Sequence, residues 1–305
     1  MKVLICDQVH PIAAKMLREA GFEVVEAGTL SEEELAKIIK DFDAAITRGS
    51  TKRTRRVFEN AKKLKVLVRA GVGLDNIDLE AAKEFGIKVF NTPRASVESV
   101  AELVIGLILN ALRRIHEADR MMKQGIRAKK ELVGMTLANR TIGIIGMGRI
   151  GSRVAELAAA FGARVLGNDA DRNRVIALGY EYRDLDDLLA EADIVTIHVP
   201  LTPKTKHLIN AERIAKMKDG AILVNTARGA VVEEKALLEA LESGKLSYVA
   251  LDVYSEEPPF KNPILEKLVK HPRVIATPHI GAQTIDAQKH AAEEAARIII
   301  NELKS

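Results

Sequence analysis

The chain has 305 residues, about twice the length of a typical domain, which predicts two domains or one large α/β unit. Hydrophobic residues make up 47% and charged residues 29%, ordinary values for a globular protein that exclude a disordered or collagen-like chain. Lys and Arg outnumber Asp and Glu by only 46 to 42 and are spread along the sequence. The charge therefore does not favour nucleic acid as a partner.

The single cysteine, Cys6, excludes an internal disulfide and fits a reducing, cytoplasmic location. The longest apolar stretch, residues 103–109, is too short to cross a bilayer, and Asp7 interrupts the first apolar run, where a signal peptide would need its hydrophobic segment. No histidine pair has the spacing of a zinc protease. We therefore expect a cytoplasmic protein with no membrane role and no metal site.

Short β-branched runs alternate with helical segments along nearly the whole chain, which is typical of doubly wound α/β proteins with parallel sheets. In the N-terminal third, Pro11 and Gly21 bound the first predicted helix, and Ser31 with Glu34 forms a capping box that opens the second. The strands predicted for this part are Lys2–Cys6, Ala44–Thr47, Lys65–Arg69 and Lys88–Asn91.

A long helix with one apolar face is predicted for about residues 97–123, and a second α/β series follows it. The final helix, about 282–303, has no strand after it, so we expect it to return to the first domain. The predicted domains are residues 1–95 with 284–305, and residues 96–283, with a cleft between them. The strands predicted for the second series are Thr141–Ile145, Arg164–Leu166, Ile194–Val199, Ile222–Asn225, Tyr248–Asp252 and Val274–Ala276.

Three glycines after the predicted strand 141–145 form a G-x-G-x-x-G pattern: Gly146 for a tight turn, Gly148 for close approach of a pyrophosphate, and Gly151 for close contact of helix and strand. Asp169 follows the next strand, where its carboxylate would accept hydrogen bonds from the adenosine ribose and repel a 2′-phosphate. The pattern predicts NAD rather than NADP. The structural alternative is an ordinary glycine-rich turn.

Five segments, residues 69–76, 146–151, 225–229, 251–258 and 277–282, together resemble the D-isomer-specific 2-hydroxyacid dehydrogenase family, in the family's order and over nearly the whole chain. Within that family the chain is most similar to members that oxidise D-3-phosphoglycerate to 3-phosphohydroxypyruvate with NAD, the first step of serine biosynthesis. The resemblance implies a Rossmann-type NAD-binding domain and a flavodoxin-like substrate domain. It also implies a short form without a C-terminal regulatory domain, and a homodimer formed through the long helix, although the apolar face of that helix could equally be buried within one chain.

The resemblance implies roles for three residues, and the chemistry of a 2-hydroxy acid fits each role. Arg228 would bind the substrate carboxylate, which a guanidinium holds in a fixed fork. His279 would act as the general acid/base that exchanges the hydroxyl proton, and Glu257 would fix its tautomer. From the residues alone, Arg228 could instead be a surface arginine, Glu257 part of a solvated loop, and His279 a helix cap.

The resemblance also implies the residues that bind NAD. Among them, His198 ends a strand and is similar to a position that lines the adenosine side of the family's pocket; as a lone histidine it could equally be structural. The full set of predicted NAD ligands is Gly146, Gly148, Arg149, Ile150, Gly151, Asp169, His198, Val199, Pro200, Thr226, Ala227, Asp252, Gly281 and Ala282.

In the first domain, Gly71, Val72 and Gly73 follow an apolar strand and would expose consecutive N–H groups suited to a carboxylate, the alternative being a plain βα turn. Arg48 and Arg69 lie nearest to strand ends and are the predicted ligands of a phosphorylated 2-hydroxy acid. A basic cluster around one of these ends would attract a phosphate or form a solvated helix start: Arg48, Lys52, Arg53, Arg55 and Arg56.

Two other functions remain open from the sequence. A glyoxylate or hydroxypyruvate reductase, or another D-2-hydroxyacid dehydrogenase, would use the same scaffold. A protein of another class, an NAD-sensing corepressor, would keep the nucleotide site and recruit partners without needing turnover.

Overall fold

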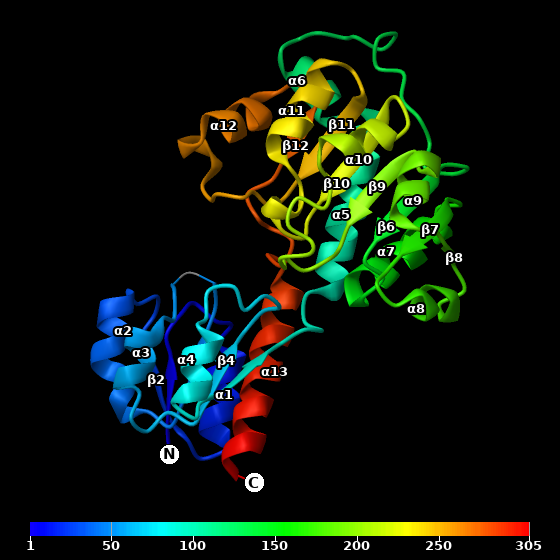
Figure 1. Cartoon of the computed structure of the whole chain (residues 1–305). Coiled ribbons are helices and arrows are strands. Elements are labelled where there is room, and N and C mark those ends of the chain that lie inside the picture. Colours follow the sequence, from blue (N-terminus) through cyan, green and yellow to red (C-terminus); the bar gives the residue numbers. More distant parts are fainter. Residues whose placement is uncertain (50, 305) are drawn as a thin grey trace. The chain divides into compact units, whose positions relative to one another are not determined.

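The computed structural model describes residues 1–49 and 51–304. The chain divides into two compact units, one of Met1–Ser99 with Ala282–Ser305 and one of Val100–Gly281. Each unit contains its own parallel sheet flanked by helices (Figure 1), which confirms the predicted fold class. None of the described helices combines the length and the apolar character that crossing a bilayer would require.

The sheet of the first unit has five parallel strands in the order β2-β1-β3-β4-β5, the order of flavodoxin-like folds. β1, β3 and β4 are almost wholly buried because helices cover both faces, so these strands are continuous apolar runs. β2 lies at the edge with charged ends and was not predicted. The strands are β1 (Lys2–Ile5), β2 (Glu23–Glu26), β3 (Ala44–Thr47), β4 (Val66–Arg69) and β5 (Lys88–Asn91).

Helices cover both faces of this sheet. The chain's last helix, α13 (Ile285–Lys304), lies beside α1 (Ile12–Glu19), and their apolar residues share one cluster with the sheet (Figure 1). The predicted capping box is confirmed at the start of α2: Glu34 N–H donates to Ser31 Oγ at 3.3 Å, and Ser31 N–H donates to the Glu34 carboxylate at 2.8 Å. The opposite face carries α2 (Glu32–Ile38), α3 (Arg55–Asn60) and α4 (Leu79–Glu84), with a short 3-10 turn at Ile39–Asp41.

The sheet of the second unit has seven parallel strands in the order β12-β11-β10-β9-β6-β7-β8. The order reverses between β6 and β9, and such a switch point is where open α/β sheets bind their ligands. β8, an edge strand of two residues, was too short to be predicted. The strands are β6 (Thr141–Ile145), β7 (Arg164–Asn168), β8 (Glu181–Tyr182), β9 (Ile194–Ile197), β10 (Ala221–Asn225), β11 (Leu246–Leu251) and β12 (Val274–Ala276).

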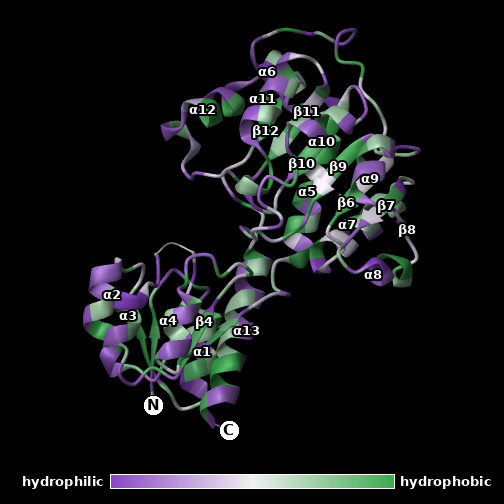
Figure 2. Ribbon diagram, in the orientation of Figure 1, coloured by the Kyte–Doolittle hydropathy of each residue, from purple (hydrophilic) through white to green (hydrophobic). Residues whose placement is uncertain are grey.

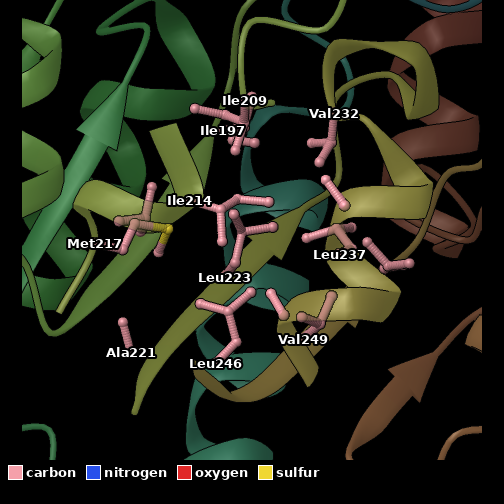
Figure 3. Packing of buried hydrophobic residues seen from close by; sticks show 14 of the residues in the cluster. Ile197, Ile209, Ile214, Met217, Ala221, Leu223, Val232, Leu237, Leu246 and Val249 are labelled. Carbon is pink, nitrogen blue, oxygen red and sulfur yellow. The ribbon is translucent and has the colours of Figure 1, made fainter. Parts of the chain in front are cut away.

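Two buried clusters hold the helices against this sheet. On one face, Ile214, Leu223, Leu237 and Val249 meet between helix and strand (Figure 3). The strands β9 and β10 are hydrophobic (Figure 2). The first face carries α9 (Leu185–Glu191), α10 (Ala211–Lys216), α11 (Glu234–Glu242) and α12 (Pro263–Lys270); the second carries α5 (Val97–Arg113), α7 (Arg149–Ala160) and α8 (Arg172–Ala177).

The prediction of one continuous helix over residues 97–123 was wrong. Arg114 has left-handed backbone geometry, with φ of 54°, and separates α5 from α6 (Ile115–Lys123). The side-chain oxygen of Asn110 accepts the N–H of His116 at 2.9 Å in place of a helical carbonyl. Apolar periodicity continued across the break, so it could not show that a side chain had replaced the helical hydrogen bond.

Candidate active site

The glycine turn stands at the switch point, directly after β6. Gly146 has φ of +94°, and a Cβ there would lie 2.8 Å from the carbonyl carbon of His198, at the end of β9. A Cβ on Gly151 would overlap the carbonyl oxygen of Gly146 and lie 3.3 Å from the Ile144 side chain. Both glycines are therefore required by close contacts within the protein itself.

Gly148 differs from Gly146 and Gly151 in the space around its Cβ position. No atom lies within 4 Å of the position that its Cβ would take, so the fold does not require glycine there. Gly148 is the N-cap of α7, and no side chain caps this helix end. Open space beside an uncapped helix N-terminus fits the pyrophosphate of a dinucleotide, which needs close approach to backbone N–H groups.

Asp169 joins the end of β7 to the glycine turn. Its Oδ2 accepts the N–H of Met147 at 2.8 Å, and its Oδ1 accepts the N–H of Asp171 at 2.9 Å. Arg174 lies 3.5 Å from the same carboxylate. Each carboxylate oxygen has a second lone pair, so Asp169 can hold the turn and still accept a ribose hydroxyl.

His198 lies on the other side of the switch point. Its N–H donates to the carbonyl oxygen of Ile145 at 2.7 Å, and its ring Nε2 lies 3.0 Å from Thr196 Oγ1. Burial lowers the pKa of His198 to about 3, so the ring is neutral at physiological pH. Val199 and Pro200 follow it along the same loop, and Val199 also borders Gly146.

His279 and Glu257 form a direct contact. His279 Nδ1 lies 2.9 Å from Glu257 Oε2 and 3.1 Å from Oε1. Because a carboxylate accepts hydrogen bonds, this contact places the proton on Nδ1 and leaves Nε2 to exchange a proton with a ligand. The two side chains are 52% and 40% exposed, so a small molecule can reach them.

Asp252 fixes the turn that carries His279. The carboxylate is buried and accepts three hydrogen bonds: from Thr277 Oγ1 at 2.6 Å and from the N–H groups of Ile280 and Gly281, both at 2.8 Å. His279 itself has φ of 57°, a backbone geometry that is costly for histidine. The hydrogen bonds on both sides of His279 maintain this geometry.

Tyr254 connects the loops that carry the histidine and the glutamate. Its hydroxyl donates to the carbonyl oxygen of Thr277 at 3.0 Å, and its N–H donates to Glu257 Oε1 at 3.3 Å. Burial, with the nearby Asp252 carboxylate, raises the pKa of Tyr254 to about 12, so the hydroxyl keeps its proton. These hydrogen bonds thus hold the loop after β11 against the loop after β12.

Arg228 follows β10, the strand beside β11. Its carbonyl oxygen accepts the Asn225 side-chain amide at 3.0 Å, and its Nη1 donates to the carbonyl oxygen of Ala227 at 2.6 Å. A Cβ on the next residue, Gly229, would overlap the Tyr254 backbone. This glycine therefore lets the arginine loop lie against the loop that leads to Glu257.

Thr226 and Gly281 complete the predicted NAD ligands of this unit. Thr226 Oγ1 is shielded from solvent and has no hydrogen-bond partner among the described residues, which fits a contact made by a ligand. Gly281 is buried, and its Cβ would lie 3.2 Å from Asp252 Oδ2. Ala282, the remaining predicted ligand, belongs to the first unit.

In the first unit, Arg69 lies across two glycine-containing loops. Gly71 has φ of +151°, and a Cβ there would overlap Arg69 Nη1. Gly49, after β3, would place a Cβ 3.3 Å from Arg69 Nη2. The guanidinium therefore contacts the loops after both β3 and β4, where Arg48, Val72 and Gly73 also lie. Gly49 was not predicted, because its role depends on an arginine from another strand.

Most of the predicted basic cluster is neutralised by acidic neighbours. Arg55 pairs with Glu84, and Arg56 pairs with Glu33 at 3.2 Å. A third member of the cluster, at position 53, is fully buried in an ion pair. A phosphate would therefore not meet the cluster as one cationic surface, and Arg48 and Lys52 are its two members without an acidic partner among the described residues.

Two residues that position the loop after β3 were missed as site residues. Asp7, after β1, accepts the N–H of Arg48 at 2.6 Å. Asn76 donates to the carbonyl oxygens of Arg48 at 3.0 Å and Thr51 at 2.8 Å. A carboxylate directly after a buried strand was the available signal for Asp7, although sequence alone does not show which loop it binds.

A family model described as D-isomer specific 2-hydroxyacid dehydrogenase, NAD binding domain, matches residues 105–281. The chain is 48% identical to the D-3-phosphoglycerate dehydrogenase of Methanocaldococcus jannaschii, over 99% of this chain and 58% of that protein. It is 45% identical to the hydroxypyruvate reductase of Thermotoga maritima, over 99% of this chain and 98% of that protein. The chain thus spans little more than half of one relative and nearly all of the other.

Among solved structures, the D-lactate dehydrogenase of Aquifex aeolicus, complexed with NAD and lactic acid, has the same fold. It is 33% identical, with a TM-score of 0.86 over 99% of this chain and 95% of that chain. The glycine turn, the uncapped end of α7 and the His279–Glu257 pair all lie within the segment that the family model matches.

Proposed function

The chain belongs to the D-isomer specific 2-hydroxyacid dehydrogenase family, and from this membership we propose that it transfers a hydride between C2 of a D-2-hydroxy acid and NAD, with 3-phosphoglycerate as the substrate. The observation that carries the proposal is the contact between His279 Nδ1 and Glu257, at 2.9 Å, on a turn held by Asp252. A hydroxyl oxidation needs such an oriented base.

Three residues of the second unit would have separate roles in the reaction. His279 Nε2 accepts the proton of the substrate hydroxyl during oxidation and returns it during reduction. Glu257 holds the ring in the tautomer that allows this and stabilises the imidazolium that forms. Arg228 binds the substrate carboxylate. The glycine turn Gly146–Gly151 would hold NAD, which would supply the hydride acceptor.

The first unit would bind the anionic groups of the substrate. Arg48 stands at the end of β3 with a half-buried side chain, and Arg69 lies at the end of β4 against Gly71. A phosphorylated 2-hydroxy acid carries a second anion besides its carboxylate, and guanidinium groups suit both. The similarity to D-3-phosphoglycerate dehydrogenases over 99% of the chain supports this substrate.

A second candidate is reduction of hydroxypyruvate, which lacks the phosphate. It is favoured by one observation: the hydroxypyruvate reductase of Thermotoga maritima is 45% identical over 99% of this chain. The two candidates share the proton and hydride chemistry. They differ only in the anion that the first unit must accommodate.

Kinetics with purified protein test both candidates. NADH oxidation is followed with 3-phosphohydroxypyruvate and with hydroxypyruvate, and NAD reduction is followed with 3-phosphoglycerate at alkaline pH. A kcat/KM at least about tenfold higher for the phosphorylated compound, equivalent to about 1.4 kcal/mol, is expected. A preference for hydroxypyruvate would select the second candidate, and no turnover with any of the three would refute both.

We also propose that the protein is a homodimer. The segment from α6 onward exposes several large apolar side chains, and grouped exposed apolar side chains mark sites of protein association. They are Ile115, Met122, Ile126, Val133 and Met135, with 40–79% of each residue exposed. Light scattering should give twice the mass of the chain, and Val133→Glu with Met122→Glu should give monomers; a monomeric native protein would contradict the proposal.

A further inference from the structure

A buried ion pair lies under the loop that carries Arg48. Arg53 Nη2 is 3.0 Å from Asp7 Oδ2, and both side chains have no exposed surface. The same oxygen of Asp7 accepts the N–H of Arg48 at 2.6 Å and the hydroxyl of Thr47 at 2.8 Å. One carboxylate oxygen of Asp7 thus binds the loop at its start, through the N–H of Arg48, and at its end, through the Arg53 side chain.

The other side of the loop is held by Asn76. Its side-chain amide donates to the carbonyl oxygens of Arg48 and Thr51. Its backbone carbonyl oxygen accepts the N–H of Arg53 at 2.7 Å. The backbone is therefore restrained at four places. In contrast, the Arg48 guanidinium makes one long contact among the described residues, Nη1 to the carbonyl oxygen of Gln8 at 3.5 Å, so it is available to a ligand.

This buried ion pair lowers the free energy of unfolding relative to apolar residues of similar size. Asp7 Oδ1 and two nitrogens of Arg53, Nε and Nη1, are buried without a hydrogen-bond partner among the described residues. Unsatisfied buried polar groups cost free energy, and a buried ion pair seldom adds more stability than apolar residues of similar size. Because Arg53 has no exposed surface, it cannot itself bind substrate. Its effect must pass through the groups that it touches.

The inference rests on the proposed function, in which Arg48 binds an anionic group of the substrate. We propose that Asp7 and Arg53 are positioning residues for Arg48: Arg53 orients the Asp7 carboxylate, and that carboxylate fixes the N–H of Arg48 and so the direction in which its side chain leaves the backbone. A positioning error of about 1 Å at a binding group is enough to lower the efficiency of an enzyme greatly.

Two neutral double variants separate positioning from general stability. Asp7→Leu/Arg53→Met removes both charges and the acceptor for the Arg48 N–H, whereas Asp7→Asn/Arg53→Met removes both charges but keeps an acceptor oxygen. Neither leaves an unpaired buried charge. Thermal unfolding and NADH affinity identify the folded proteins. If the leucine variant does not fold, Asp7→Ala/Arg53→Met removes the same acceptor with less bulk.

The leucine variant is expected to raise the KM for 3-phosphohydroxypyruvate about tenfold, with kcat and the NADH affinity within about twofold of the native values. The asparagine variant should restore the KM to within about threefold. Hydrogen exchange of the Arg48 amide should be faster in the leucine variant and slow again in the asparagine variant.

An unchanged KM in the leucine variant, or an equal increase in both variants, would overturn the proposal. The exchange measurement does not depend on turnover. If the native protein turns over no 2-hydroxy or 2-keto acid while the Arg48 amide still depends on the acceptor, the proposed function fails but the structural restraint remains.

Discussion

The Asp252 carboxylate accepts the N–H of Ile280, the residue directly after His279, at 2.8 Å. It also accepts the N–H of Gly281 and the hydroxyl of Thr277, so one buried carboxylate defines the backbone on both sides of the histidine. His279 keeps a left-handed backbone because these neighbours are held. The direction of the imidazole is therefore set by the end of β11.

Asp252→Asn should lower kcat by about tenfold to a hundredfold, because an amide NH₂ would face one of the N–H groups and displace the histidine turn. NADH binding, measured by fluorescence, tests whether Asp252 is also the NAD ligand that the sequence predicted. Asp219→Asn is the control, since Asp219 is an exposed carboxylate of the same unit. A native kcat in the Asp252 variant would show that the turn does not need this contact.

Gly148→Ala should mainly weaken NADH binding, whereas Gly151→Ala should mainly lower the free energy of unfolding. Gly148 has open space at its Cβ position, so its alanine variant should fold, with stability within about 1 kcal/mol of the native protein because alanine is a poorer N-cap, and bind NADH at least about tenfold more weakly. Gly151 contacts the Gly146 backbone, so its variant should lose about 1–3 kcal/mol of unfolding free energy through overpacking. Urea denaturation and NADH titration of both variants measure the difference. Native NADH affinity in Gly148→Ala would remove this turn from the cofactor site.

Asp169→Ala should shift the cofactor preference toward NADP. The carboxylate repels a 2′-phosphate, and Arg174, 3.5 Å away, would be left to attract one. The ratio of kcat/KM for NADPH to that for NADH is expected to rise at least about tenfold. Asp169→Asn should keep more of the restraint on Met147 and so separates the charge effect from a distorted turn. An unchanged ratio in both variants would contradict the assignment.

His198 should make the protein less stable in acid. Its pKa in the folded protein is about 3, below the ordinary 6.5, so the unfolded chain binds a proton that the folded protein does not. Stability is therefore full above pH 6.5 and falls as the pH is lowered from 6.5 toward 3, by up to about 1.4 kcal/mol per unit from this residue. Urea denaturation of native protein and His198→Gln at several pH values should show a shallower loss in the variant; parallel curves would exclude His198 as the cause.

The sequence was sufficient for the fold class because buried parallel strands are continuous apolar runs, and the helices between them carry recognisable ends such as Ser31. It was insufficient where side chains replace regular hydrogen bonds. The break at Arg114 depends on Asn110, and the edge strands β2 and β8 are short and polar, so neither periodicity nor composition distinguishes them from loops.

The candidate site was predictable in part for a similar reason. A glycine pattern reports local backbone geometry, and Gly146 and Gly151 meet the contacts that the pattern implies. The pairing of Glu257 with His279 came from the resemblance, since residues 22 positions apart give no local signal of contact. Asp7 and Asn76 act between loops of different strands, and such contacts exist only after the sheet is assembled.

The role of His279 as the acid/base is tested by the turnover of His279→Gln with 3-phosphohydroxypyruvate and NADH, compared with the native protein at matched NADH saturation. The kcat of the variant should be about 10²–10⁴-fold lower with NADH affinity unchanged, because the variant loses the proton donor and keeps the glycine turn. A variant that reduces the substrate at the native rate would contradict the assignment of His279 as the acid/base.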